Sequence, residues 1–119
     1  MHFLYGNPQS AAAWITVDLR QDGGVELVGP GIDEYSSSGY FTTGAWTLVE
    51  LVMDYNAGTA RLWINNQAVA FNGSSTVPVA FSGGGFVKVQ VTPTWGGCGG
   101  AVPTVDSWLW YDHIHVSGK

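Results

Sequence analysis

Apolar and polar residues alternate along much of this chain. Around Ile15 and Val17 the alternate positions are Thr16 and Asp18, and in 86–92 three valines alternate with polar or aromatic residues. Successive side chains of a strand point to opposite faces, so this alternation predicts half-buried β-strands. No helical periodicity extends beyond two turns. The predicted strands cover residues 12–20, 25–28, 40–43, 46–55, 59–65, 67–71, 80–81, 86–92 and 108–116, and 29–39 is predicted to be a loop.

The segment 46–65 gives the clearest pattern, a hairpin whose two strands are joined by the turn Asn56-Ala57-Gly58. Turns of two to five residues with Asn and Gly are typical of β-hairpins. If Leu62 and Ile64 point inward, their neighbours at positions 61, 63 and 65 point outward. The dipeptide Asn65-Asn66 suits the positive φ angles of a second tight turn.

Short strands separated by Gly, Pro, Ser and Asn predict an all-β fold. We expect one domain, residues 1–119, folded as an antiparallel two-sheet β-sandwich. Seventeen glycines and an aromatic content of 13% agree with this class. The predicted core residues are Val49, Leu51, Met53, Leu62, Ile64, Val87, Val89, Val91, Ile114 and Val116.

Charge and hydropathy argue against two classes of partner. The net charge is −5, and the four basic residues are scattered along the chain, so a basic patch for nucleic acid is not expected. No apolar run approaches the ~20 residues of a membrane span. The first residues lack the basic and apolar regions of a signal peptide, so none is predicted.

Four residues of the hairpin predict a ligand-binding surface. Trp63 lies between two polar outward positions, Arg61 and Asn65, and Glu50 on the first strand shares their face. An exposed indole can stack on the apolar face of a sugar while its polar neighbours bind the hydroxyl groups. We therefore expect a glycan site here, with Glu50 orienting Arg61 through a cross-strand pair. Packing of Trp63 beneath a loop is the alternative.

A second set of residues suits polysaccharide β-elimination, which needs a group that neutralises a uronate carboxylate, a base and an acid. If several outward faces belong to one sheet, the candidates are Tyr111, His113, His115, Gln90 and Arg20. Hydrolysis is disfavoured, because Glu50 and Asp54 on one strand lie about 13 Å apart, too far for a retaining carboxylate pair. His113 and His115 lack further ligands of zinc-site type, so neither a metal nor a cofactor is predicted.

Three segments of the chain form a recognisable set: the motif Trp46-x-x-Val-Glu-Leu, the segment Arg61-Leu62-Trp63-Ile64-Asn65-Asn66 and the closing Tyr111-Asp112-His113-Ile114-His115-Val116-Ser117. Together they resemble the concanavalin-A-like lectin/glucanase superfamily. The resemblance covers about two-thirds of the chain and is closest to the C-terminal half of lyase-like and laminin-G-like members. It implies a jelly-roll sandwich and favours an extracellular location. The chain is shorter than such domains, and the Arg- and Gln-containing motifs of alginate lyases are not recognisable.

Three functions therefore remain open. The sequence favours a lectin-like carbohydrate-binding module without catalysis. The alternatives are a polysaccharide-lyase-like enzyme, or a remnant of one, and a structural or interaction domain. A short sandwich with few charged residues leaves strand edges unprotected, so a homodimer is also expected.

Overall fold

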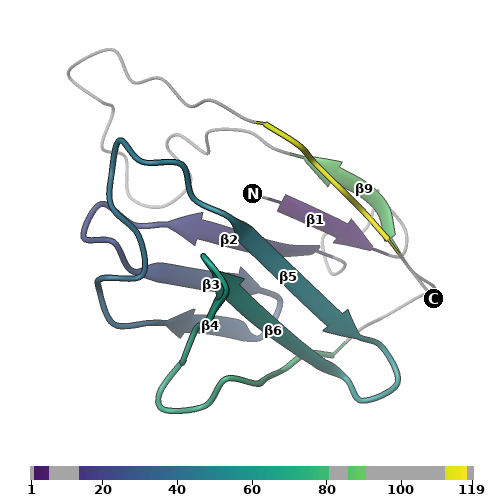
Figure 1. Cartoon of the computed structure of the whole chain (residues 1–119). Coiled ribbons are helices and arrows are strands. Elements are labelled where there is room, and N and C mark those ends of the chain that lie inside the picture. The colour runs from purple at the N-terminus through teal and green to yellow at the C-terminus, as the bar shows by residue number, and fades with distance from the viewer. Residues whose placement is uncertain (1, 6–13, 81–85, 91–111, 118–119) are drawn as a thin grey trace, which may run out of the picture.

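The chain forms two antiparallel sheets, which lie one in front of the other in Figure 1. This computed structural model describes residues 2–5, 14–80, 86–90 and 112–117, with the backbone alone for 2–5 and 86–90. The first sheet has the order β4-β3-β2-β1-β9, and the second has the order β5-β6-β7 with β8 also paired to β6. The strands are β1 (His2–Tyr5), β2 (Trp14–Leu19), β3 (Val25–Gly29), β4 (Ile32–Tyr35), β5 (Val49–Asp54), β6 (Thr59–Ile64), β7 (Gln67–Ala68), β8 (Val77–Pro78) and β9 (Phe86–Gln90). The predicted all-β, two-sheet sandwich is confirmed.

The core lies between the two sheets and takes apolar side chains from both. Leu62 and Ile64, both predicted core residues, are buried, and Val49, Leu51 and Met53 are partly buried and pack against the same cluster. The fully or nearly buried members are Ile15, Val17, Val25, Leu27, Ile32, Ala60, Leu62, Ile64, Val69, Phe71, Val77 and Val79. Alternation with period two therefore identified the inward faces of β5 and β6 correctly.

The prediction for the end of the chain is wrong in the part that the structure describes. Residues 112–117 form no strand, and the expected core residues Ile114 and Val116 are 60% and 54% exposed. His113 has a φ of 45°, outside the range of an extended strand, so the alternation of side chains is interrupted there. The expected core residues Val87, Val89 and Val91 lie outside the described side chains.

The structure also contains strands that the sequence did not predict. β4 lies within the expected loop 29–39, because Pro30 and Gly31 form a two-residue turn that pairs Gly29 with Ile32. Gly31 has a φ of 75°, as the third position of a type II turn requires. β1 and β8 were likewise not predicted, whereas the short strand expected at 40–43 is not formed.

Two hydrogen bonds of side chains tie the first sheet to its surroundings. The Ser36 hydroxyl accepts from the Val25 backbone N–H at 2.8 Å, and both residues are buried. The Tyr40 hydroxyl accepts from the Ala70 N–H at 2.9 Å, which links the loop after β4 to the segment after β7. Within the described residues, no helix is long and apolar enough to cross a membrane.

Candidate functional site

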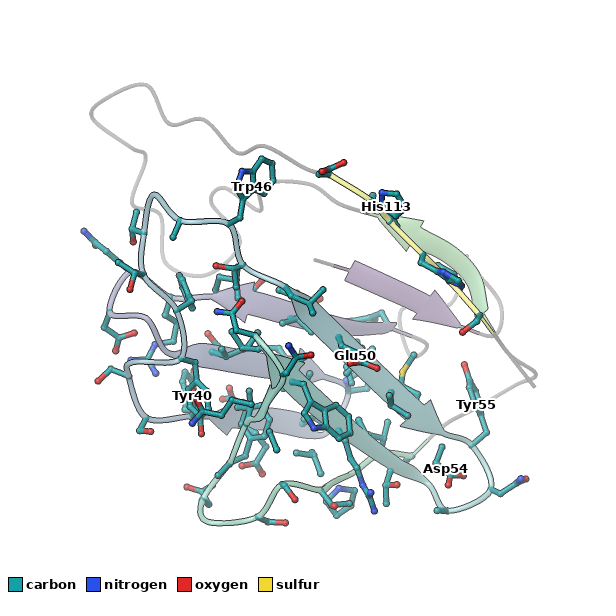
Figure 2. The ribbon with its side chains drawn as sticks, in the orientation of Figure 1. Tyr40, Trp46, Glu50, Asp54, Tyr55 and His113 are labelled. Atoms are coloured by element: carbon teal, nitrogen blue, oxygen red, sulfur yellow. The ribbon has the colours of Figure 1, made fainter. Side chains whose placement is uncertain are left out.

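The outer face of the second sheet carries the residues that the hairpin pattern placed there. On β5, Glu50 and Asp54 are exposed, and on β6 Arg61 is exposed while Trp63 is half-buried. The register pairs Glu50 with Trp63 and Val52 with Arg61. Figure 2 shows Trp46 before the start of β5, with Glu50 and Asp54 further along it. The structure therefore brings three of the four expected ligand-binding residues, Glu50, Arg61 and Trp63, onto one face.

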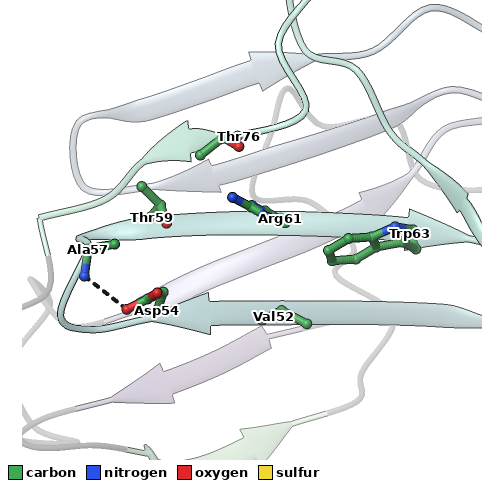
Figure 3. A pocket seen from close by; sticks show the side chains of 7 residues that line it. All are labelled: Val52, Asp54, Ala57, Thr59, Arg61, Trp63 and Thr76. Carbon is green, nitrogen blue, oxygen red and sulfur yellow. Dashed lines mark hydrogen bonds between the residues drawn. The ribbon is translucent and has the colours of Figure 1, made fainter.

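An open groove crosses this face between β5, β6 and the segment that precedes β8. Its volume is about 250 Å³. In Figure 3 the Trp63 indole lies on the β5 side of β6, whereas Arg61 extends on the side of Thr76. The lining residues are Val52, Asp54, Ala57, Thr59, Arg61, Trp63 and Thr76. The groove therefore combines an aromatic surface with charged and hydroxyl side chains.

The turn between β5 and β6 fixes the Asp54 carboxylate at one end of the groove. Its Oδ1 atom accepts from the backbone N–H groups of Asn56 and Ala57, at 3.0 and 2.9 Å. This Asx turn is a local alternative to a backbone turn and is the reason that Asp suits the last position of β5. Both bonds use Oδ1, so within the described residues Oδ2 is available for a ligand.

The expected cross-strand pair of Glu50 with Arg61 is not a directly opposed one, because Glu50 lies opposite Trp63 and Val52 lies opposite Arg61. Arg61 is a diagonal neighbour of both Glu50 and Asp54, and among the described residues it makes no ion pair with either. Its guanidinium donors are therefore not used by the part of the protein that the structure describes.

Asn65, the fourth expected ligand-binding residue, lies in the turn after β6. Asn65 and Asn66 have φ angles of 51° and 65°, so the predicted tight turn is confirmed. The Asn65 Oδ1 atom accepts from the Leu48 N–H at 3.0 Å, and the Asn65 N–H donates to the Leu48 carbonyl at 2.9 Å. The Asn65 side chain thus holds the start of β5 against the end of β6.

The residues expected for elimination chemistry do not all share a surface. Arg20 lies in the turn between β2 and β3, on the other sheet from Glu50 and Arg61. It forms an ion pair with Asp22, donates to the Ser36 carbonyl at 3.3 Å and stacks over Tyr35, with its Cζ atom 5.6 Å from the ring centre. These three contacts give Arg20 a structural role at that end of the first sheet.

Of the other elimination candidates, His113 and His115 are exposed in the segment 112–117. Gln90 ends β9, where the structure describes the backbone alone, and Tyr111 lies outside the described residues. No group of three His, Cys, Asp or Glu side chains that would suit a metal ion occurs among the residues with described positions.

The outer face of the first sheet has its own polar cluster, centred on Tyr35. Hydrogen bonding to the Glu26 carboxylate, and then to that of Asp33, raises the pKa of Tyr35 to about 12. Both carboxylates favour the neutral phenol, since its ionisation would bring a third negative charge beside them. This cluster lies on the opposite side of the sandwich from the groove.

Sequence reasoning did not name Thr59, Thr76 or Asp54 as part of the site. The hairpin register would have found two of them, because Asp54 pairs directly with Thr59. Thr76 reaches the groove through the pairing of β8 with β6, which no local pattern indicates.

Comparison with known proteins adds no relative to this description. No protein-family model matches the chain, and neither curated proteins nor solved structures give a significant match.

Proposed function

We propose that this protein is a carbohydrate-binding module without catalysis, and that it holds a sugar in the groove over Trp63. The observation that carries the proposal is the half-buried Trp63 indole, which lines an open groove together with Arg61, Asp54 and two threonines. A sugar ring presents an apolar face of C–H bonds and a rim of hydroxyl groups. The indole suits the first, and the polar side chains around it suit the second.

The partial burial of Trp63 favours this role. β6 pairs with β5, β7 and β8, so Trp63 stands on the central strand of its sheet. Its covered part is held by the surrounding structure, while the remainder faces the groove. A rigid aromatic surface loses little conformational freedom on binding, and this improves affinity. The groove volume of about 250 Å³ is just below the usual range of ~300–1,000 Å³ for ligand pockets. It suits a small part of a glycan chain.

The scaffold is compatible with the resemblance to the concanavalin-A-like superfamily, because both are antiparallel two-sheet sandwiches. Such a fold hosts binding and catalysis alike, so it does not decide between them. The groove supports binding. A lyase would need Arg20 free to neutralise a substrate carboxylate, and Arg20 is engaged by Asp22 and Tyr35 at a turn of the other sheet.

A glycan array probed with three forms of the protein tests the proposal. The wild type is expected to bind, and Trp63→Ala to lose binding. The matched control is Trp46→Ala, which removes an indole that is 72% exposed but does not line the groove. Equal loss in both variants, or none in either, would contradict the site. Absence of binding by the wild type to any glycan would contradict the function.

A further inference from the structure

We propose that the groove over Trp63 takes an uncharged glycan, whose hydroxyl groups donate to the Asp54 carboxylate and accept from the Arg61 guanidinium. This inference rests on the proposed function and names the ligand class for the same site. Three features support it: the charges around the groove, the hydrogen-bonding capacity of the side chains that line it, and the backbone hydrogen bonds that hold Asp54 in place.

The charges around the groove disfavour an anionic ligand. One cation, Arg61, has two carboxylates, Glu50 and Asp54, as its diagonal neighbours across the β5–β6 pair. The backbone positions of diagonal neighbours are roughly 7–8 Å apart, so all three charged side chains start from the same part of this face. A ligand carboxylate in the groove is therefore attracted by Arg61 and repelled by Asp54, the one carboxylate among the lining residues, and Glu50 adds a further negative charge on the same face. The net charge of −5 for the whole chain adds to the repulsion.

The hydrogen-bonding capacity of these groups leads to the same ligand class. A guanidinium only donates and an ionised carboxylate only accepts, whereas a threonine hydroxyl does both. A uronate carboxylate only accepts, so this group can serve Arg61 but cannot donate to Asp54, and it brings a second negative charge into the groove beside Asp54. Neighbouring sugar hydroxyls both donate and accept, so a neutral sugar can bind Arg61, Asp54 and the hydroxyls of Thr59 and Thr76 together.

Asp54 is also held in place before any ligand arrives. Its Oδ1 atom accepts from two backbone N–H groups of the turn, and the second carboxylate oxygen makes no hydrogen bond to another described residue. A preordered acceptor lowers the entropy cost of binding a hydroxyl. It also fixes a negative charge in the groove, which an acidic sugar would meet on entry.

The test is calorimetric titration of the full chain with neutral gluco-, manno- and galacto-oligosaccharides and with an oligogalacturonate of the same length. We expect a neutral ligand to bind at least about tenfold more tightly than the oligogalacturonate. The affinity for the neutral ligand should change less than about twofold between low and high salt, because this ligand carries no charge that salt could screen. Asp54→Asn keeps a side-chain oxygen for the turn but removes the charge, and should weaken the neutral ligand about tenfold.

The control variant is Asp33→Asn, which makes the same change of charge on the other sheet and should leave both affinities unchanged. Tighter binding of the oligogalacturonate, weakened by salt, would overturn the inference and leave the proposed function standing. Equal effects of Asp33→Asn and Asp54→Asn would also overturn it, since the charge would then act from any position. Failure of every glycan to bind would overturn the proposed function itself.

Discussion

Mutation of Asn65 tests whether its side chain stabilises the fold or binds a ligand. Replacement by alanine removes the acceptor of the Leu48 N–H and puts an ordinary L-residue at a φ of 51°. The left-handed conformation costs about 1–2 kcal/mol for such a residue. The lost hydrogen bond adds ~0.5–1 kcal/mol at this exposed position. We expect Asn65→Ala to lower the free energy of unfolding by about 1.5–3 kcal/mol.

Two further variants divide this effect. Asn65→Gly tolerates the φ angle but lacks the acceptor, so the expected loss is only about 0.5–1 kcal/mol. Asn65→Asp keeps an acceptor and tolerates the left-handed region, so its loss should stay below about 0.5 kcal/mol. For a chain of 119 residues, 1 kcal/mol corresponds to roughly 4 °C in Tm. Asn65→Ala should therefore melt about 6–12 °C lower than the wild type.

The assay is urea unfolding followed by tryptophan fluorescence, with thermal melting as a second measurement. The order of stability expected is wild type and Asn65→Asp together, then Asn65→Gly, then Asn65→Ala. If all three variants were as stable as the wild type but bound glycan more weakly, Asn65 would be a ligand group, and its assignment as the residue that holds β5 against β6 would be wrong.

The remaining predictions concern the first sheet and the free strand edge. Gly23→Ala should destabilise the protein far more than Gly31→Ala. Both glycines have positive φ, but a Cβ at Gly23 would lie 2.6 Å from the Phe41 carbonyl oxygen, whereas one at Gly31 meets nothing within 4 Å. Equal Tm values of the two variants would contradict this. The pKa of Tyr35 is raised from 10.0 to about 12, so its contribution to stability is complete below pH 10 and is lost as the pH rises through 12. A phenolate titration that is unchanged in Tyr35→Phe around pH 12 would contradict this assignment. Finally, β5 is an edge strand of its sheet in the described structure, and we expect this edge to pair with a second copy in a homodimer. Light scattering that gives the mass of one chain at high concentration would contradict this expectation.

The sequence predicted best where a local pattern determines the structure. Alternation placed Leu62 and Ile64 in the core and Arg61 and Trp63 on the outer face of the same strand. The turn at Asn65-Asn66 was predictable because few residues adopt positive φ readily. The fold class follows from these elements, since strands with one apolar face must pack against another layer.

The sequence predicted poorly where distant segments determine the structure. β4 has the residues Ile-Asp-Glu-Tyr, with one buried apolar side chain, and it is recognised as a strand only through its pairing with β3. Ile114 and Val116 alternate as core residues would, but their segment joins neither sheet in the described structure. The separation of Arg20 from Arg61 likewise depends on which sheet each strand enters, and single-strand periodicity does not contain this information.

The central claim is that a glycan stacks on Trp63. The most direct measurement is an NMR titration of the protein with a glycan that it binds. The indole N–H signals of its six tryptophans are followed. The Trp63 signal is assigned by its absence in Trp63→Phe. We expect the Trp63 signal to shift saturably, at the affinity measured by calorimetry, while the Trp46 signal stays in place. Saturable binding that leaves the Trp63 signal unmoved would contradict the claim.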